Sequence, residues 1–162
     1  GVGGDSAGGY LSVLLNLIAD QQVLPVQVNQ QPHFQMVLFP MLDQRGKTES
    51  YQEFTNQLIL TQNIMNYFTG HYLNNPEEAD TPLGSPLLSK YLKDCPKTYL
   101  LTVEYDPLRD EGQLFAKRLK NEGVDIEYQH FEDCMHSFFS SARFSPRAKR
   151  GVLEICERLK SL

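Results

Sequence analysis

A short pattern near the start of the chain can supply a nucleophile. Gly4-Asp5-Ser6-Ala7-Gly8 matches Gly-x-Ser-x-Gly, in which small residues let the chain turn sharply and leave the serine hydroxyl exposed. A helical apolar pattern follows at once, so Ser6 is predicted to open a helix. The free N–H groups of that helix, including that of Ala7, could then stabilise a developing oxyanion. A flexible glycine-rich loop is the alternative interpretation.

A serine nucleophile needs a base to accept its proton, and histidine is the usual base. The chain contains four histidines. His33 precedes a predicted strand and His71 lies in a polar segment, so both are expected at the solvent-exposed surface. His130 falls inside a predicted strand, where a packed or hydrogen-bonded histidine is the usual case. His136 alone follows the carboxyl end of a strand, where we expect Ser6 to emerge.

An acid must orient this base, and two aspartates follow predicted strands. Asp106 is favoured because its strand is the one next in sequence to the strand that precedes His136. Asp43 is expected to tie down a turn instead. The sequence therefore predicts that Ser6, Asp106 and His136 meet at one edge of a sheet.

Apolar periodicity predicts the elements that would position these residues. Strands are expected over 34–41, 97–105 and 124–131, and helices after Ser6 to about Asp20, over 108–122, and from Pro146 with Ser145 as its cap. Strands alternating with helices indicate an α/β fold with a parallel sheet and crossover helices. The buried face of the first helix is expected to comprise Ala7, Leu11, Leu14, Leu15 and Ile18.

Two further segments deviate from this alternation. Residues 44–75 are polar but carry a helical stripe, which favours either a cap or lid insertion or a plain packing helix; the stripe comprises Leu60, Ile64, Met65, Phe68 and Tyr72. Residues 74–86 contain several prolines and are predicted to be loop.

The first residues are interpreted as a turn that precedes any complete element. We therefore expect residues 1–162 to be one partial domain whose N-terminal part lies upstream.

Composition excludes several classes of protein. The 162 residues carry 15 basic and 20 acidic side chains, a net charge of -5, which disfavours nucleic acid as a partner. The sequence has no run of roughly 18 to 20 apolar residues that could span a membrane. Three cysteines without close pairing predict neither a disulfide framework nor a metal site.

Three sequence features together resemble the hormone-sensitive-lipase-like α/β-hydrolases, and within them the arylacetamide deacetylase type. These are the Gly3-Gly4-Asp5-Ser6-Ala7-Gly8-Gly9 run, the Asp106-Pro107-Leu108-Arg109-Asp110 run with Glu111-Gly112, and His136. The resemblance implies the C-terminal part of an α/β-hydrolase fold and a serine esterase that needs no cofactor or metal. Its substrates would be small-molecule carboxylic esters of short to medium acyl chain, with arylamides or glycerides as further candidates.

The resemblance also implies roles for individual residues. Ser6 would be the nucleophile, Asp106 the orienting acid, His136 the base and Asp110 structural. Further candidates for substrate contacts are Asp5, Leu108 and Phe138, and core packing is the alternative for Phe138. Relatives often carry His-Gly-Phe where this chain has His136-Ser137-Phe138.

The family's His-Gly-Gly-Gly stretch, which completes the oxyanion hole, would lie upstream of Ser6. Losing an oxyanion donor costs roughly 100- to 1,000-fold in turnover, so these residues alone are expected to hydrolyse esters slowly or not at all. The rival hypotheses are a non-catalytic binding module on the same scaffold and an inactive esterase fragment. An upstream anchor or signal would decide between a cytoplasmic and an endoplasmic-reticulum-associated protein.

Overall fold

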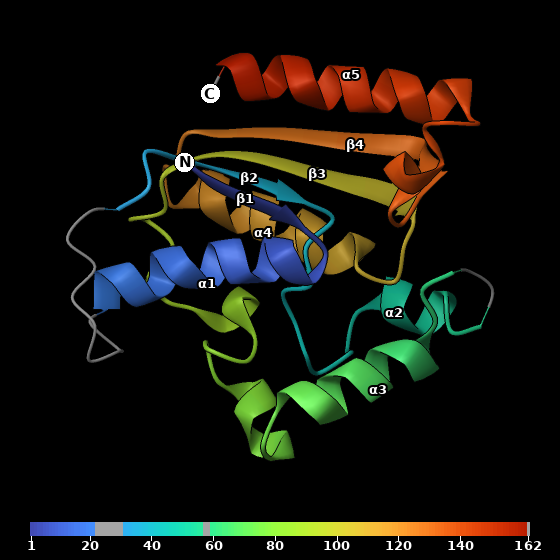
Figure 1. Cartoon of the computed structure of the whole chain (residues 1–162). Helices are drawn as coiled ribbons and strands as arrows, with labels where there is room; N and C mark the ends of the chain where they lie inside the picture. Colours follow the sequence, from blue (N-terminus) through green and yellow to red (C-terminus); the bar gives the residue numbers. More distant parts are fainter. Residues whose placement is uncertain (22–30, 57–58, 162) are drawn as a thin grey trace.

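The structure, a computed structural model, describes residues 1–21, 31–56 and 59–161. These residues form an α/β fold around a parallel four-stranded sheet of order β1-β2-β3-β4 (Figure 1). The strands are β1 (Val2–Asp5), β2 (Phe34–Leu38), β3 (Lys97–Tyr105) and β4 (Ile126–Met135). The helices are α1 (Ala7–Gln21), α2 (Glu49–Glu53), α3 (Gln62–Tyr72), α4 (Arg109–Asn121) and α5 (Pro146–Ser161). The predicted α/β class, with crossover helices between parallel strands, is confirmed.

The sequence-based expectation of three strands is wrong, because the first residues form strand β1 rather than a turn. This strand pairs in parallel with β2, with Gly4 opposite Val37 and Asp5 opposite Leu38. Its sequence, Val-Gly-Gly-Asp, has a single β-branched residue, two glycines and none of the alternation that indicates a strand. Pairing with β2 supplies the stabilisation that local preference lacks.

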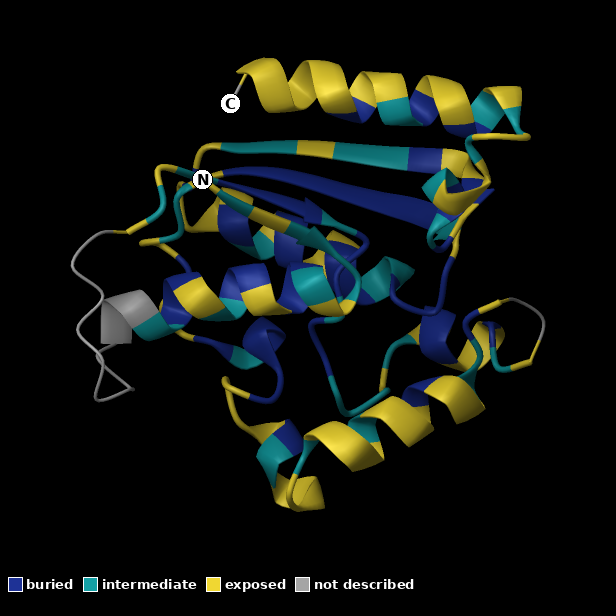
Figure 2. Cartoon of the chain, in the orientation of Figure 1, coloured by how far each residue is buried: buried dark blue, intermediate teal, exposed yellow. Residues whose placement is uncertain are grey.

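Helices cover both faces of the sheet (Figure 1). Helices α1 and α4 pack on one face, where Val13, Leu17, Leu100 and Phe115 belong to a single buried cluster. Helix α5 packs on the other face, where Tyr99, Leu101, Phe131 and Ile155 contribute to a second cluster. Figure 2 shows most of β3 buried, from Thr98 to Val103, and the outer face of α5 exposed. Because β3 is covered on both faces, its central residues, Tyr99 to Val103, are apolar apart from Thr102.

The buried face of α1 differs from the predicted one. Leu11 and Leu15 are 49% and 52% exposed, whereas Tyr10, Val13 and Leu17 are buried. The apolar residues of this helix extend around most of its circumference, so their spacing alone does not decide which stripe faces the sheet.

The polar segment 44–75 holds two helices: α3 lies beyond α1, away from the sheet (Figure 1), and the short α2 lies beside the start of α4, where Ser50 hydrogen-bonds Asp110. Helix α3 matches the predicted helical stripe, whereas the short α2 has no counterpart in the prediction. Only Leu60 and Met65 of the predicted stripe are buried; Ile64, Phe68 and Tyr72 are exposed. Residues 57–58 of this segment lie outside the described residues.

Other boundaries shift by a few residues. Strand β2 ends at Leu38 rather than at position 41, and β4 continues to Met135 rather than ending at 131. The predicted loop over 74–86 contains a short 3-10 helix, η1 (Pro76–Asp80), and ends at the start of a second, η2 (Pro86–Leu88). Among the described residues, no helix combines the length and apolarity needed to cross a bilayer.

Candidate active site

Ser6 occupies a sharp turn between β1 and α1. Its φ of 53° lies in the left-handed region, which a residue with a side chain seldom adopts. Its N–H donates to the carbonyl of Leu38 (2.9 Å), and its carbonyl accepts from the N–H groups of Tyr10 (3.0 Å) and Met41 (3.3 Å). A Cβ at Gly4 would lie 2.5 Å from the backbone of Gly8, so this turn requires glycine at position 4. The small residues of the motif therefore permit the turn that presents Ser6.

Asp106 and His136 follow the carboxyl ends of two adjacent strands, β3 and β4. The pairing of these strands shifts near their ends, because Val103 lies opposite Phe131 whereas Tyr105 lies opposite Met135. Such an irregularity re-aims the residues that follow it. The backbone N–H of His136 then donates to the carbonyl of Tyr105 (3.2 Å), which places its ring beside Asp106.

The three predicted residues form one chain of hydrogen bonds. His136 Nδ1 lies 2.7 Å from Asp106 Oδ2, and His136 Nε2 lies 3.0 Å from Ser6 Oγ. A carboxylate can only accept hydrogen bonds, so Nδ1 carries the proton and Nε2 is left to accept from the serine hydroxyl. Asp106 and His136 are both buried, and the second oxygen of Asp106 accepts from the N–H of Leu108 at 2.9 Å.

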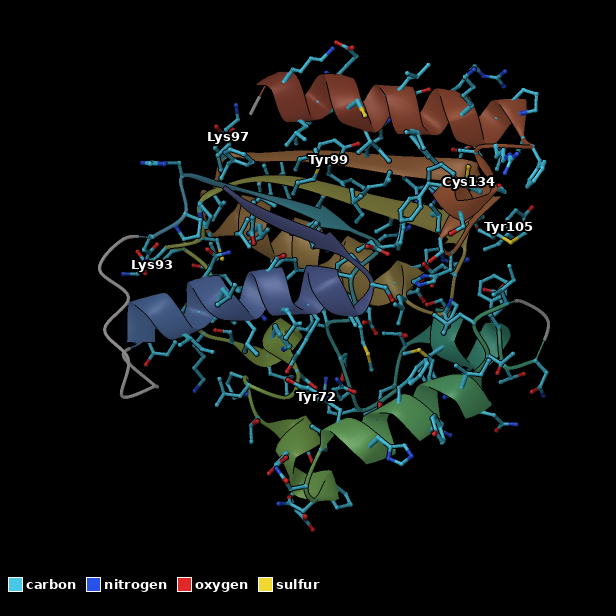
Figure 3. All side chains as sticks on the ribbon, viewed as in Figure 1. Tyr72, Lys93, Lys97, Tyr99, Tyr105 and Cys134 are labelled. Carbon is cyan, nitrogen blue, oxygen red and sulfur yellow. The ribbon has the colours of Figure 1, made fainter. Side chains whose placement is uncertain are left out.

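An apolar pocket of about 460 Å³ opens beside Ser6. Its walls come from the start of α1, the turn after β2 and helix α3, and include Ala7, Tyr10, Met41, Leu60, Met65 and Phe68. The Tyr10 hydroxyl donates to the carbonyl of Leu83 (2.5 Å) and lies 3.0 Å from the Tyr72 hydroxyl. Figure 3 shows Tyr72 between α3 and α1. Segment 44–75 therefore contributes one side of a pocket that adjoins the serine.

The residues predicted to contact the oxyanion or the substrate do not all line the pocket beside Ser6. Ala7 lines the pocket as the first residue of α1, so no helical carbonyl precedes it to accept its N–H. Leu108 is buried in a cluster with Leu60 and Met65, behind the pocket wall. Phe138 packs in the core between the sheet and α5 and does not line the pocket. Asp5 is partly buried at the end of β1.

Among the described residues, His136 is the histidine that hydrogen-bonds Ser6 Oγ, and Asp106 rather than Asp43 hydrogen-bonds His136. Asp43 accepts from the backbone and guanidinium of Arg45, which fits the expected turn. His130 bonds Thr102 (2.8 Å) and Glu104 (3.0 Å), a hydrogen-bonded histidine in a strand as expected. His71 is exposed, but it lines the pocket beside Ser6, which its position in a polar segment did not indicate.

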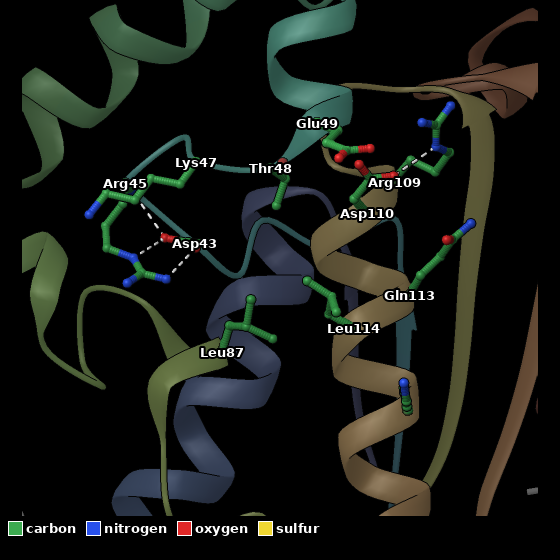
Figure 4. A pocket seen from close by; sticks show the side chains of 11 residues that line it. Asp43, Arg45, Lys47, Thr48, Glu49, Leu87, Arg109, Asp110, Gln113 and Leu114 are labelled. Atoms are coloured by element: carbon green, nitrogen blue, oxygen red, sulfur yellow. Dashed lines mark hydrogen bonds and ion pairs between the residues drawn. The ribbon is translucent and has the colours of Figure 1, made fainter.

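A second hollow, of about 680 Å³, lies between the segment 43–49 and helix α4 (Figure 4). Two of its cations already have partners, because Arg45 pairs with Asp43 (2.6 Å) and Arg109 with Asp110 (2.9 Å). Within the described residues, no group of three His, Cys, Asp or Glu side chains is arranged to hold a metal ion.

Comparison with known proteins agrees with this architecture. Residues 1–140 match the family described as the alpha/beta hydrolase fold, so the chain belongs to the α/β hydrolase fold family. A solved structure of a hyperthermophilic esterase from Pyrobaculum calidifontis superimposes with a TM-score of 0.88 at 30% identity, over 99% of this chain and 52% of that one.

Two curated relatives carry the names of ester hydrolases. The carboxylic ester hydrolase LipN of Mycobacterium tuberculosis is 29% identical over 99% of this chain and 43% of its own length. Neutral cholesterol ester hydrolase 1 of Rattus norvegicus is 29% identical over 84% of this chain and 47% of its own length. The chain thus spans about half the length of the relatives it matches. The resemblance to the hormone-sensitive-lipase-like group is confirmed.

Proposed function

We propose that this chain carries the catalytic centre of a serine esterase that hydrolyses carboxylic esters. The observation that carries the proposal is the hydrogen-bond chain from Ser6 Oγ through both nitrogens of His136 to Asp106. This arrangement matches what a weak hydroxyl nucleophile needs, namely a base within reach and a buried acid that holds the base in one tautomer.

The reaction proceeds in two acyl-transfer steps. His136 Nε2 accepts the hydroxyl proton of Ser6 as Oγ attacks the ester carbonyl, and the proton then passes to the departing alcohol. Water attacks the resulting acyl-enzyme with His136 again as base, which releases the acid and restores Ser6. The N–H of Ala7, at the start of α1, is proposed to donate to the developing oxyanion.

The apolar pocket supports an ester with a hydrocarbon acyl or alcohol group. Its walls are mainly apolar, with Gln44, Thr69 and His71 as further polar residues besides Ser6, and 460 Å³ falls in the range of small-molecule sites. We propose that segment 44–75 acts as a cap, since α3 supplies Met65 and Phe68 to these walls. Such a cover would exclude water from the reacting ester.

A fluorophosphonate probe, which reacts with activated serines, tests the proposal on this chain without requiring full turnover. We expect labelling at Ser6, loss of labelling in Ser6→Ala, and retention in Ser140→Ala, which alters an exposed serine near the site. Asp106→Asn should slow labelling on the order of 1,000-fold or more, because the imidazole loses its orienting acceptor.

Asp43, the other candidate for the acid that orients His136, provides a matched comparison. Asp43→Asn removes a carboxylate that pairs with Arg45 rather than with His136, so its effect on labelling should be small beside that of Asp106→Asn. An unreactive Ser6 in the folded chain, or equal losses in the two variants, would argue for a non-catalytic module.

A further inference from the structure

The mechanism above leaves the carboxyl group of Glu111 unused, although it lies close to the site. Glu111 is in the first turn of α4, shortly after Asp106, and has no exposed surface. Burying a charged carboxylate costs several kcal/mol unless it is paired. Among the ion pairs of the described residues, none includes Glu111.

The two oxygens of this carboxyl group have different surroundings. Oε1 accepts the backbone N–H of Leu42, in a very short contact, and that of Asp43 at 3.3 Å. Oε2 is buried and has no hydrogen-bond partner. One oxygen therefore makes both contacts, and the other is the atom that a proton would occupy.

Both contacts reach the turn that follows β2, residues 39–44. The N–H of Met41 in this turn donates to the carbonyl of Ser6 (3.3 Å), so the turn is bonded to Ser6 on one side and to Glu111 on the other. Phe39 packs its ring against the imidazole of His136, with centroids 4.9 Å apart. Met41 and Gln44 line the apolar pocket. The turn thus contacts the serine, the histidine and the pocket together.

We propose that Glu111 is a positioning residue, which holds the turn 39–44 against Ser6 and His136 through the N–H groups of Leu42 and Asp43. The proposal rests on the proposed function, because it concerns the same serine and histidine. Glu111 itself does not contact the pocket; it acts through the turn. A neutral carboxylic acid suits this task, since it keeps Oε1 as an acceptor without placing a charge in the core.

The surroundings of Glu111 favour that neutral form. Burial raises the pKa of Glu111 well above its usual value of 4.5, and the Asp43 and Asp106 carboxylates raise it further, whereas the Leu42 and Asp43 N–H groups oppose the rise. Arg45 and Tyr51 are the other ionisable groups within electrostatic reach from neighbouring elements. Ionisation of Glu111 would add an unpaired charge beside Asp43 and Asp106.

The sign of the pH dependence follows from this raised pKa. The unfolded chain releases the proton near the usual value, whereas the folded chain retains it. The contribution of Glu111 to stability is therefore complete below about pH 4.5 and is lost as the pH rises through the folded-state pKa. Each N–H bond to ionised Glu111 is itself stronger, but the ionised group is an unpaired charge in the core, so the packing around it, including the turn 39–44, should open more readily over this rise in pH.

Amide hydrogen exchange tests directly whether Glu111 stabilises the turn 39–44. In Glu111→Ala, which removes the acceptor, the N–H groups of Leu42 and Asp43 should lose about tenfold or more of their protection, while core amides of β3 keep theirs. Glu111→Gln retains a neutral oxygen acceptor and should preserve protection at both positions. Unchanged protection at Leu42 and Asp43 in Glu111→Ala would overturn the proposal.

Fluorophosphonate labelling as a function of pH tests the consequence for the site. The wild-type rate should fall as the pH rises through the folded-state pKa of Glu111, and Glu111→Gln should abolish that fall. Glu122→Gln makes the same chemical change at the exposed end of α4 and should keep the wild-type profile. The same fall with rising pH in Glu111→Gln and the wild type would also overturn the proposal.

The two measurements separate this inference from the proposed function. If Ser6 is unreactive in every variant, the proposed esterase activity fails, while the exchange rates of Leu42 and Asp43 still decide whether Glu111 holds the turn. If Glu111→Ala does not fold, the labelling profile of Glu111→Gln decides.

Discussion

The ring of Phe39 lies edge-on against the imidazole of His136, with the two centroids 4.9 Å apart and the planes at 65°. Phe39 is buried at the end of β2 with a φ of 34°, and its N–H donates to the carbonyl of Leu101 (2.6 Å). Phe138 and Phe139 pack around the same ring. The imidazole is therefore oriented by Asp106 through hydrogen bonding and by Phe39 through packing.

Phe39→Leu should weaken both the fold and the site. Leucine keeps much of the buried volume but removes the aromatic contacts, so we expect the free energy of unfolding to fall by about 1–2 kcal/mol. Fluorophosphonate labelling of Ser6 should slow in the folded variant, because His136 gains freedom to leave its position. Urea denaturation and labelling rates measure the two effects. Phe144→Leu, at a position 83% exposed, is the matched control and should change neither.

Tyr10→Phe should loosen the contact between α1 and the segment 44–75. Because the Tyr10 hydroxyl donates to Leu83, it accepts from Tyr72, and the substitution removes both bonds. Loss of each such bond costs about 1 kcal/mol. Burial raises the pKa of Tyr10, so the hydroxyl stays protonated in neutral solution.

A double-mutant cycle with Tyr72→Phe isolates the contact between the two hydroxyl groups. Tyr72→Phe alone removes one bond and should cost less than Tyr10→Phe, and the combined loss should be smaller than the sum of the single losses. Strictly additive losses in urea denaturation would contradict a direct contact.

Ser137→Gly should stabilise the turn after His136. Ser137 has a φ of 55°, a left-handed conformation that costs a residue with a side chain roughly 1–2 kcal/mol and glycine little. The greater freedom of glycine in the unfolded chain offsets part of this gain, so the net increase should be about 0.5–1 kcal/mol. The measurement is the urea midpoint at constant slope. Ser140→Gly, in η3 (Phe138–Ser141) without a positive φ, should lower stability instead.

Much of the fold was predictable because its signals are local. The apolar runs of β2 and β3, the glycine after α4 and the Ser145 cap before α5 each depend on neighbouring residues. Strand β1 was missed because Val-Gly-Gly-Asp forms a strand only by pairing with β2. The buried face of α1 was predicted wrongly because Leu11 and Leu15 are as apolar as the residues that pack against the sheet.

The sequence predicted which three residues form the candidate site, but not the residues that surround them. Ser6 could be selected from its motif and the helix that follows, and Asp106 and His136 because each follows a predicted strand, since carboxyl ends of parallel strands meet at one edge. No sequence pattern indicated that His71 lines the pocket or that Glu111 contacts the turn 39–44. Both depend on how distant segments pack.

The sequence alone determined the sharp turn at Ser6, the order of the elements and the parallel α/β class, since steric limits on small residues and apolar periodicity act over a few positions. The tertiary structure decided the shift between β3 and β4 that brings His136 to Asp106, the face of α1 that is buried, and the hold of Glu111 on the turn after β2. These depend on strand pairing and packing between residues that are far apart in the chain, where many arrangements satisfy the local preferences and only the assembled core selects one.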